Sequence, residues 1–208
     1  GEYIYKFVSA ANWEASDADP ISRMATGDKY LDNGKLYVAK FASDGSGQWV
    51  ELTISNPAIS GYATYAFADQ ADVCVNARLA ADAVGATKMD RPEWCGVNPA
   101  NGEVYFTLTN NGNRRVEPSS SSQVPVDGPN PRAYTDMKGS TAQNGNPNGH
   151  ILRMKEGPTG ASATGFTWDV YAFGAQSDAD ASTVNLSKLT ADNDFSSPDG
   201  LVFSPATG

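Results

Sequence analysis

The sequence predicts an all-β protein with one inserted helix, because short strand signals are separated by strong turn signals along the whole chain. Its 208 residues include 20 glycines and 12 prolines, whereas 40% are hydrophobic, which is enough to bury a core. Helical periodicity occurs only once. Together these observations argue against a long helical bundle and favour one ordinary globular domain spanning residues 1–208.

Strands are expected wherever aromatic and β-branched residues cluster between turn residues. Glycine-rich or Asn-Gly connections indicate hairpins at residues 43–47 and 98–102, and residues 150–154 and 166–173 are expected to form another strand pair. The expected strands are residues 3–8, 35–41, 48–53, 94–97, 103–109, 150–154 and 166–173, with a further strand starting at 201–203.

One amphipathic helix is expected over residues 69–84. Ala71, Val75, Leu79 and Ala83 recur every fourth residue, which places them on one face of a helix, and Gly85 is suited to end it.

Residues 110–149 have a different composition from the rest of the chain. They contain a run of four serines at 119–122 and almost no aliphatic side chains. Such a segment buries little apolar surface, so we expect a long polar loop inserted within the single domain. Loops of this length inside a compact domain are usually functional or mobile.

An internal repeat relates residues 92–102 to residues 198–208. Both copies are eleven residues long and share proline followed by an acid, then Pro-Ala and a final glycine. The strand signals between the copies are typical of one propeller blade with a long insertion, so the sequence predicts a partial β-propeller.

The net charge of the chain limits the classes of binding partner that we expect. With 15 basic and 24 acidic residues, the formal net charge is −9, and no run of Lys or Arg is present. We therefore expect neither nucleic acid nor a membrane surface as a partner. No apolar stretch is long enough to span a membrane, and no signal peptide is expected within these residues.

Cysteine and histidine usage limits the metal chemistry. Cys74 and Cys95 form no CxxC motif; they are expected to be buried thiols, with a single disulfide between them left open. The one histidine, His150, does not suffice for a common catalytic zinc site. A metal here would need mostly oxygen ligands, which favours calcium or oxidised iron.

Acidic residues at equivalent positions of the repeat point to a metal-ligating pair. Glu93 and Asp199 would start neighbouring inner strands and face one propeller axis, where their repulsion calls for a cation. Arg91, two residues from Glu93, would project to the same side and supply a fork-shaped donor for phosphate. The alternative is an ordinary exposed Arg–Glu pair.

Seven segments resemble the PhoX-type alkaline phosphatase family, in that family's order and over nearly the whole chain. They are GEYIYKFVS (1–9), GKLYVAKF (34–41), MDRPEW (89–94), TLTNN (107–111), NPR (130–132), GHI (149–151) and SPDGL (197–201). The resemblance implies a metal-dependent phosphatase with a six-bladed propeller, of which this chain would be about half. It also implies a calcium and iron cofactor, a small phosphate ester as the partner and a periplasmic or secreted location. We expect a monomer.

By position, the resemblance makes Arg91 and Glu93 catalytic, Arg91 on the phosphate and Glu93 on the metal, with Glu2 and Asp199 as weaker metal ligands. Further candidates are Asn110, Asn111 and His150, for which a structural role is expected over a functional one, and Arg132 and Arg153, which nothing local separates from surface charges.

The chain departs from the family in lacking its upstream iron-binding cysteine segment, so part of the metal site is expected to be missing and the chain alone to be inactive. Two other functions stay open: a non-catalytic, calcium-stabilised propeller that serves as a binding module, and a calcium-dependent lactonase-like hydrolase, which the Ser197–Gly200 turn also fits.

Overall fold

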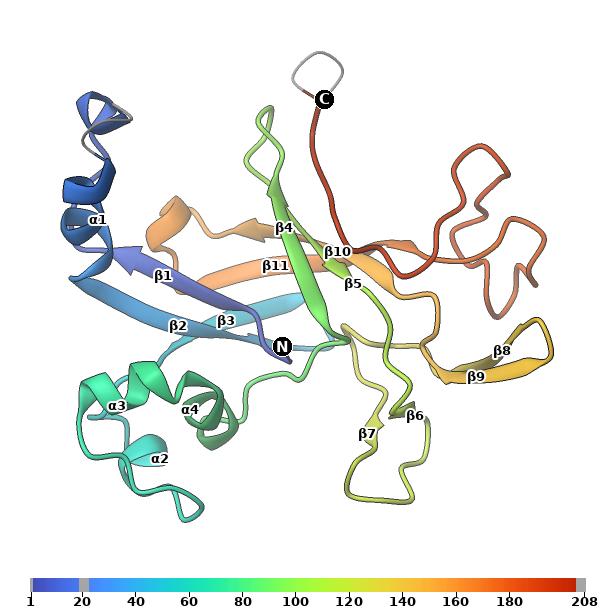
Figure 1. The fold of residues 1–208 in the computed structure, drawn as a ribbon, viewed down its shortest axis with the longest axis horizontal. Helices are drawn as coiled ribbons and strands as arrows, with labels where there is room; N and C mark the ends of the chain where they lie inside the picture. Colours follow the sequence, from blue (N-terminus) through green and yellow to red (C-terminus); the bar gives the residue numbers. More distant parts are fainter. Residues whose placement is uncertain (1, 19–22, 205–208) are drawn as a thin grey trace.

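The protein is mostly β, as predicted, in a computed structural model that describes residues 2–18 and 23–204. Figure 1 shows the strands crossing the centre of the molecule, with a group of short helices at one end. The strands are β1 (Tyr5–Ser9), β2 (Gly34–Phe41), β3 (Ser46–Glu51), β4 (Pro92–Val97), β5 (Val104–Leu108), β6 (Arg114–Arg115), β7 (Val124–Pro125), β8 (Tyr134–Lys138), β9 (Thr141–Gly145), β10 (His150–Glu156) and β11 (Gly165–Phe173).

Seven of these strands form one curled antiparallel sheet. Its order is β1-β2-β3-β11-β10-β5-β4, and the three expected hairpins, β2–β3, β4–β5 and β10–β11, are confirmed. The sheet curls far enough for residues of both its edge strands, β1 and β4, to line one small cavity of about 170 Å³. Hydrogen bonds between distant strands such as β3 and β11 join the hairpins into this one sheet.

The expectation of a single helix is wrong. The described chain contains η1 (Ala15–Ala18), α1 (Arg23–Leu31), α2 (Pro57–Ser60), α3 (Gln70–Val75), α4 (Ala77–Ala83) and η2 (Gly160–Ser162). None of these helices is long and apolar enough to cross a membrane.

The helix expected at 69–84 is broken into α3 and α4 at Asn76. Asp69 caps α3 as a helix start should, since its side chain accepts from the Asp72 backbone N–H. At Asn76 the backbone leaves helical geometry (φ −102°, ψ 38°), while its amide donates to the Asp72 carboxylate at 2.7 Å. The Asn76 backbone N–H still donates to the Asp72 carbonyl, so the break is a change in the backbone dihedral angles, which the spacing of apolar residues does not reveal.

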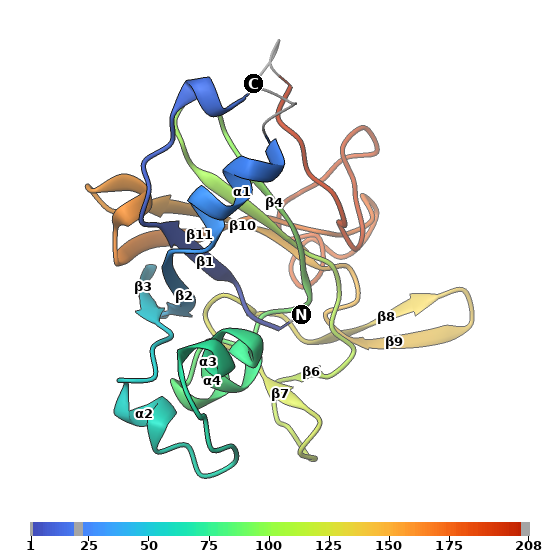
Figure 2. The same ribbon diagram turned by 60° about the vertical axis from the view of Figure 1, so that its left-hand side comes forward.

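Two hydrophobic clusters cover opposite faces of the sheet. Val38 and Ala39, neighbours on β2, belong to different clusters because successive strand residues point to opposite faces. The first cluster includes Leu52, Ile59 and Val73 and is covered by α2, α3 and α4, which lie beside the β1–β3 end of the sheet in both views (Figure 2). The second lies among the central strands, with Trp49, Met89, Phe106, Leu108, Leu152 and Phe166.

Residues 110–149, where one long polar loop is expected, contain short strands. They form two small sheets, β6–β7 and β8–β9, and the β8–β9 hairpin projects from the main sheet in both views (Figure 1; Figure 2). The segment ends at Gly149 (φ 64°), where a Cβ atom would lie 1.8 Å from the Thr109 carbonyl oxygen, so only glycine fits. Five polar residues of the segment are buried, namely Arg114, Asn130, Arg132, Asn146 and Asn148.

The strand expected to start at residues 201–203 does not form within the described chain, and the last four residues of the second repeat copy lie outside the described residues. Instead, this segment packs on the β4–β5 hairpin. Leu201 covers Gly96, and the Phe203 and Tyr105 rings lie 5.0 Å apart between centroids. Thr107 Oγ1 donates to the Asp199 carbonyl oxygen, so the segment runs beside the hairpin.

Both cysteines are free and exposed, so the expectation of buried thiols is wrong and no bridge joins them. Cys74 lies on the outer side of α3, whereas its neighbour Val73 is fully buried. Cys95 lies on β4, which is an edge strand of the sheet formed by the described residues.

Candidate functional site

Arg91 has an unusual backbone conformation. Its φ of 50° is in the left-handed region, which non-glycine residues rarely adopt. Hydrogen bonds hold this conformation from both sides: Arg91 N–H donates to the Met89 carbonyl at 3.0 Å, and Thr109 N–H donates to the Arg91 carbonyl at 3.2 Å. Strain of this kind costs roughly 1–3 kcal/mol and concentrates at functional sites.

The Arg91 side chain is 56% exposed and is held at one end by Asn110. Arg91 Nη1 donates to Asn110 Oδ1 at 2.8 Å, and Asn110 Nδ2 donates to Ser197 Oγ at 3.2 Å. Ser197 is itself left-handed, with φ 49°. Two left-handed residues far apart in the sequence are therefore joined through one asparagine, and we call Arg91, Glu93, Asn110 and Ser197 the Arg91 cluster.

Glu93 joins this cluster through a β-bulge. Pro92 pairs with Leu108 and Trp94 with Thr107, which leaves Glu93 without a partner on β5. Bulges of this type re-aim side chains and are frequent beside active sites. Glu93 Oε1 lies 3.9 Å from Arg91 Nη2, so the predicted proximity of the two side chains is confirmed. The bulge and the left-handed turn bring them together, however, rather than regular strand alternation.

The other two predicted metal ligands make different contacts. Glu2 forms an ion pair with Arg78 of α4 at 2.7 Å. Asp199 is exposed, and its backbone carbonyl is placed beside β5, where it accepts from Thr107 Oγ1. Among residues 2–18 and 23–204, no three His, Cys, Asp or Glu side chains are grouped so as to hold a metal ion. The described residues therefore do not by themselves fit a calcium and iron cluster.

The remaining candidates make structural contacts. Arg132 is buried and donates to the carbonyl oxygens of Gly149 and Gly174; burial lowers its pKa. Arg153 pairs with Asp169 on the exposed face of β10–β11. Asn111 donates to Asp90 at 2.9 Å, a contact that makes it part of a buried polar network beneath Arg91.

This network is centred on Asp90, which is fully buried and directly precedes Arg91. Its carboxylate accepts from Arg114 Nε at 2.8 Å and from Asn146 Nδ2 at 3.0 Å. Asn146 Oδ1 in turn accepts from Arg132 at 3.0 Å. Because Arg114 and Asn146 belong to the 110–149 segment, the network fixes that segment and the Asp90–Arg91 turn to one another.

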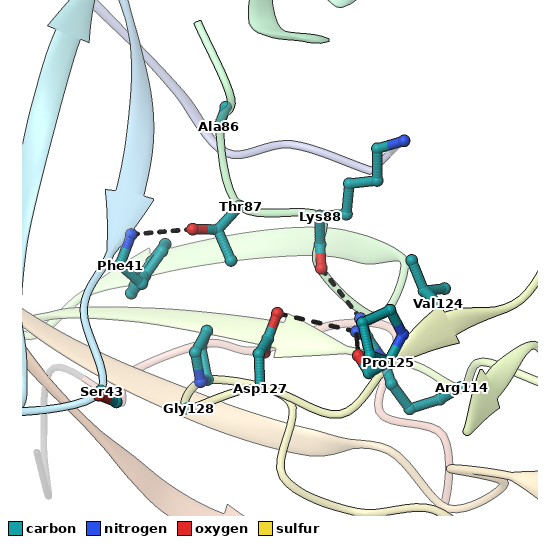
Figure 3. A pocket seen from close by; sticks show the side chains of 11 residues that line it. Phe41, Ser43, Ala86, Thr87, Lys88, Arg114, Val124, Pro125, Asp127 and Gly128 are labelled. Carbon is teal, nitrogen blue, oxygen red and sulfur yellow. Dashed lines mark hydrogen bonds and ion pairs between the residues drawn. The ribbon is translucent and has the colours of Figure 1, made fainter. Parts of the chain in front are cut away.

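Figure 3 shows Arg114 at the edge of a cavity of about 420 Å³, with its guanidinium directed at the Lys88 carbonyl and the Asp127 carboxylate. Arg114 donates to the Lys88 and Pro125 carbonyls at 2.9 and 2.5 Å, in addition to Asp90. Burial raises the pKa of Asp127. The donor nitrogens of Arg114 are already paired, and Lys88, from the same lining, forms an ion pair with Asp82 at 3.5 Å. The guanidinium of Arg91, in contrast, is exposed.

His150 is a buried partner of the same network, as the structural alternative in the sequence implied. Its Nδ1 lies 3.0 Å from Asn146 Nδ2, and its Nε2 lies 2.8 Å from the Pro129 carbonyl oxygen. A neutral imidazole protonated on Nε2 satisfies both contacts. Burial lowers the pKa of His150 from 6.5 to about 4, although Asp90 acts in the opposite direction.

This shift predicts a loss of stability in mild acid. Between pH 6.5 and about 4, the unfolded chain binds a proton at His150 that the folded chain does not. As the pH is lowered from 6.5 to about 4, the free energy of unfolding should therefore decrease by roughly 3 kcal/mol in total. Below about pH 4, His150 should contribute no further change. Urea denaturation at several pH values measures this, with His150→Gln as the comparison. Equal pH dependence in both proteins would contradict the assignment.

Asp90, Arg114 and Asn146 were not among the residues predicted from the sequence. A polar segment predicts exposure, and nothing local in it shows that its side chains meet at Asp90. The sequence held only an indirect sign that Asp90 is important. Asp90 lies within MDRPEW, one of the segments that carry the family resemblance.

Comparisons with known proteins give one consistent result. The family described as alkaline phosphatase PhoX matches residues 1–208. The structure of Pseudomonas fluorescens PhoX in complex with vanadate, a transition-state analogue, matches at 41% identity and a TM-score of 0.76. The alignment covers 99% of this chain and 33% of that one, so the chain spans about a third of that protein's length. No curated protein sequence matches the chain. On the match over its full length, the chain belongs to the alkaline phosphatase PhoX family.

Proposed function

We propose that this chain is the phosphate-binding part of a phosphatase that hydrolyses phosphate monoesters, and that Arg91 binds the phosphoryl group. The Arg91 cluster carries the proposal, because it presents an exposed guanidinium in a fixed position on a strained backbone. The vanadate bound by P. fluorescens PhoX supports it, since vanadate resembles a phosphoryl group in the transition state and 99% of this chain aligns with that protein.

Arg91 and Asn110 would have different roles in binding the ester. Arginine stays charged at alkaline pH and presents a planar fork of donors that suits phosphate oxygens. Asn110 uses one amino group of Arg91 and so fixes the plane of the guanidinium, which leaves its remaining donors for the ester. A preorganised donor of this kind stabilises charge on the transferred group without reorganising during the reaction.

Glu93 is the metal ligand that we propose for this chain, with calcium and iron as the metals that the family resemblance implies. The bulge directs its carboxylate to the same place as Arg91. Since the described residues do not group into a metal site, further ligands would have to come from outside them, and we assign no step of the reaction to a metal. Asp199 and Glu2 stay weaker proposals.

The finer architecture and the location are also proposals. The TM-score of 0.76 over a third of a PhoX structure supports a partial PhoX domain, and that this domain is about half of a six-bladed propeller is proposed from the family resemblance. A periplasmic or secreted location rests on the family resemblance alone, as does a monomeric state.

Membership of the PhoX family favours the phosphatase over a lactonase-like hydrolase or a non-catalytic binding module. Assays should use the natural polypeptide that carries this sequence. We expect it to hydrolyse nitrophenyl phosphate at alkaline pH, to be inhibited by vanadate and to contain iron together with calcium. The 208-residue chain alone should show little turnover. Hydrolysis of lactones but not of phosphate esters, or calcium alone without turnover, would overturn the proposal in favour of one of the alternatives.

A further inference from the structure

A second cavity, of about 480 Å³, adjoins the Arg91 cluster. Asn110 and Ser197, the two residues that connect to Arg91, also line this cavity. Its volume lies in the range of ligand-binding pockets, about 300–1,000 Å³. A phosphate held by Arg91 would therefore have the rest of its ester beside or within this space.

The outer wall of the cavity is the projecting β8–β9 hairpin, which a buried asparagine holds in place. Asn148 is 7% exposed and donates to Tyr134 Oη and to Asp136 Oδ2, both at 2.8 Å. Its Oδ1 accepts from Ser196 Oγ at 2.8 Å. Asn148 thus fixes the hairpin to the Ser196–Ser197 turn, and the cavity between them is preformed rather than dependent on a ligand.

The lining is polar and has no aromatic side chain; Met137 is its one large apolar residue. Two amides in this lining, those of Gln143 and Gln176, make no hydrogen bond to another residue within 2–18 or 23–204. Lys138 likewise makes no ion pair in the described part of the chain. Donors and acceptors without partners, on a wall without aromatic rings, suit hydroxyl groups better than an aryl ring.

We propose that this cavity binds the alcohol portion of the phosphate ester and favours hydroxyl-rich alcohols, sugars and polyols, over aryl groups. Gln143 and Gln176 are the residues that determine this preference, each through hydrogen bonds to substrate hydroxyls. The inference rests on the proposed phosphatase function, because the position of the cavity relative to Arg91 gives it this role.

The test compares two substrates in one protein. In the natural polypeptide that carries this sequence, Gln143→Ala combined with Gln176→Ala should lower kcat/KM for a hexose phosphate about tenfold, mostly through KM. The kcat/KM for nitrophenyl phosphate should stay within about twofold, because an aryl group makes few of these hydrogen bonds. Gln48→Ala, a glutamine exposed on β3, is the matched control and should change neither value.

If the double variant lowers kcat/KM equally for both substrates, or for neither, the inference is overturned. Hydrolysis of nitrophenyl phosphate by the unaltered protein would still support the proposed function in that case. Failure of the unaltered protein to hydrolyse either ester would overturn both. Inhibition by the free hexose is a second measurement, and it does not depend on hydrolysis of a sugar ester. The hexose should inhibit the unaltered protein competitively and the double variant more weakly.

Discussion

Replacing Asp90 by asparagine should lower the free energy of unfolding by about 3–5 kcal/mol, the range measured when one partner of a buried ion pair is removed. Asp90 is fully buried, and its partner Arg114 is 1% exposed, at a distance of 2.8 Å. The asparagine has nearly the same shape, so the loss comes from leaving the buried Arg114 charge with only the longer ion pair to Asp127, at 3.8 Å. Urea denaturation, with the slope checked for constancy, measures the change.

Asp169→Asn is the matched control for this prediction. Asp169 also pairs with an arginine, Arg153, but at an exposed position where the side chains are 50% and 38% exposed. Exposed pairs contribute about 0–1 kcal/mol, so the control should be nearly as stable as the original protein. A similarly small effect for Asp90→Asn would show that the buried network does not hold the 110–149 segment in place.

Replacing Arg91 by alanine should lower kcat/KM for phosphate monoesters by about 100- to 1,000-fold, the usual cost of losing one preorganised donor to transition-state charge. The effect should be mainly on kcat if Arg91 binds the phosphoryl group more strongly in the transition state than in the substrate. Stability should change little, since the side chain is 56% exposed and its ion pair with Glu93 is long, at 3.9 Å. Steady-state kinetics in the natural polypeptide that carries this sequence measures the loss.

Arg153→Ala serves as the control, because Arg153 is also an exposed arginine paired with a carboxylate. Its kcat/KM should match that of the original protein. Arg91→Lys should recover only part of the activity, since an ammonium keeps the charge but not the planar fork. Undiminished hydrolysis by Arg91→Ala would remove Arg91 from the site.

The strands of the main sheet could be predicted from the sequence because their signals are local. Alternating apolar residues and Asn-Gly or glycine-rich turns specify a hairpin within about twenty residues, and β2–β3, β4–β5 and β10–β11 form as expected. The joining of these hairpins into one seven-stranded sheet depends on pairs such as β3 with β11, more than a hundred residues apart, for which no local signal exists.

The features of the fold that the sequence did not predict also lack a local signal in the sequence. Apolar spacing predicted one helix at 69–84, but the backbone leaves helical geometry at Asn76 and divides it into α3 and α4. Polar composition predicted a long polar loop at 110–149 and gave no sign that Arg114 and Asn146 would be buried. Asp90, from another part of the chain, accepts their hydrogen bonds. Burial of polar side chains depends on partners, which composition does not indicate.

For the site, the sequence indicated Arg91 and Glu93 correctly as neighbours, from their spacing and from the resemblance. It did not indicate that the bulge at Glu93 and the left-handed backbone at Arg91 and Ser197 would create the arrangement. Convergence of Glu93 with Asp199, inferred from the repeat, stays a prediction, since only the backbone of Asp199 is placed beside the β4–β5 hairpin.

Calorimetric titration with orthovanadate tests most directly whether Arg91 binds the phosphoryl group. The natural polypeptide that carries this sequence should bind vanadate, Arg91→Ala should bind it at least about 30-fold more weakly, and Arg153→Ala should bind it unchanged. Asn110→Ala should give an intermediate loss, because the guanidinium keeps its charge but loses the contact that fixes its plane. Equal affinity of the original protein and Arg91→Ala for vanadate would contradict the account.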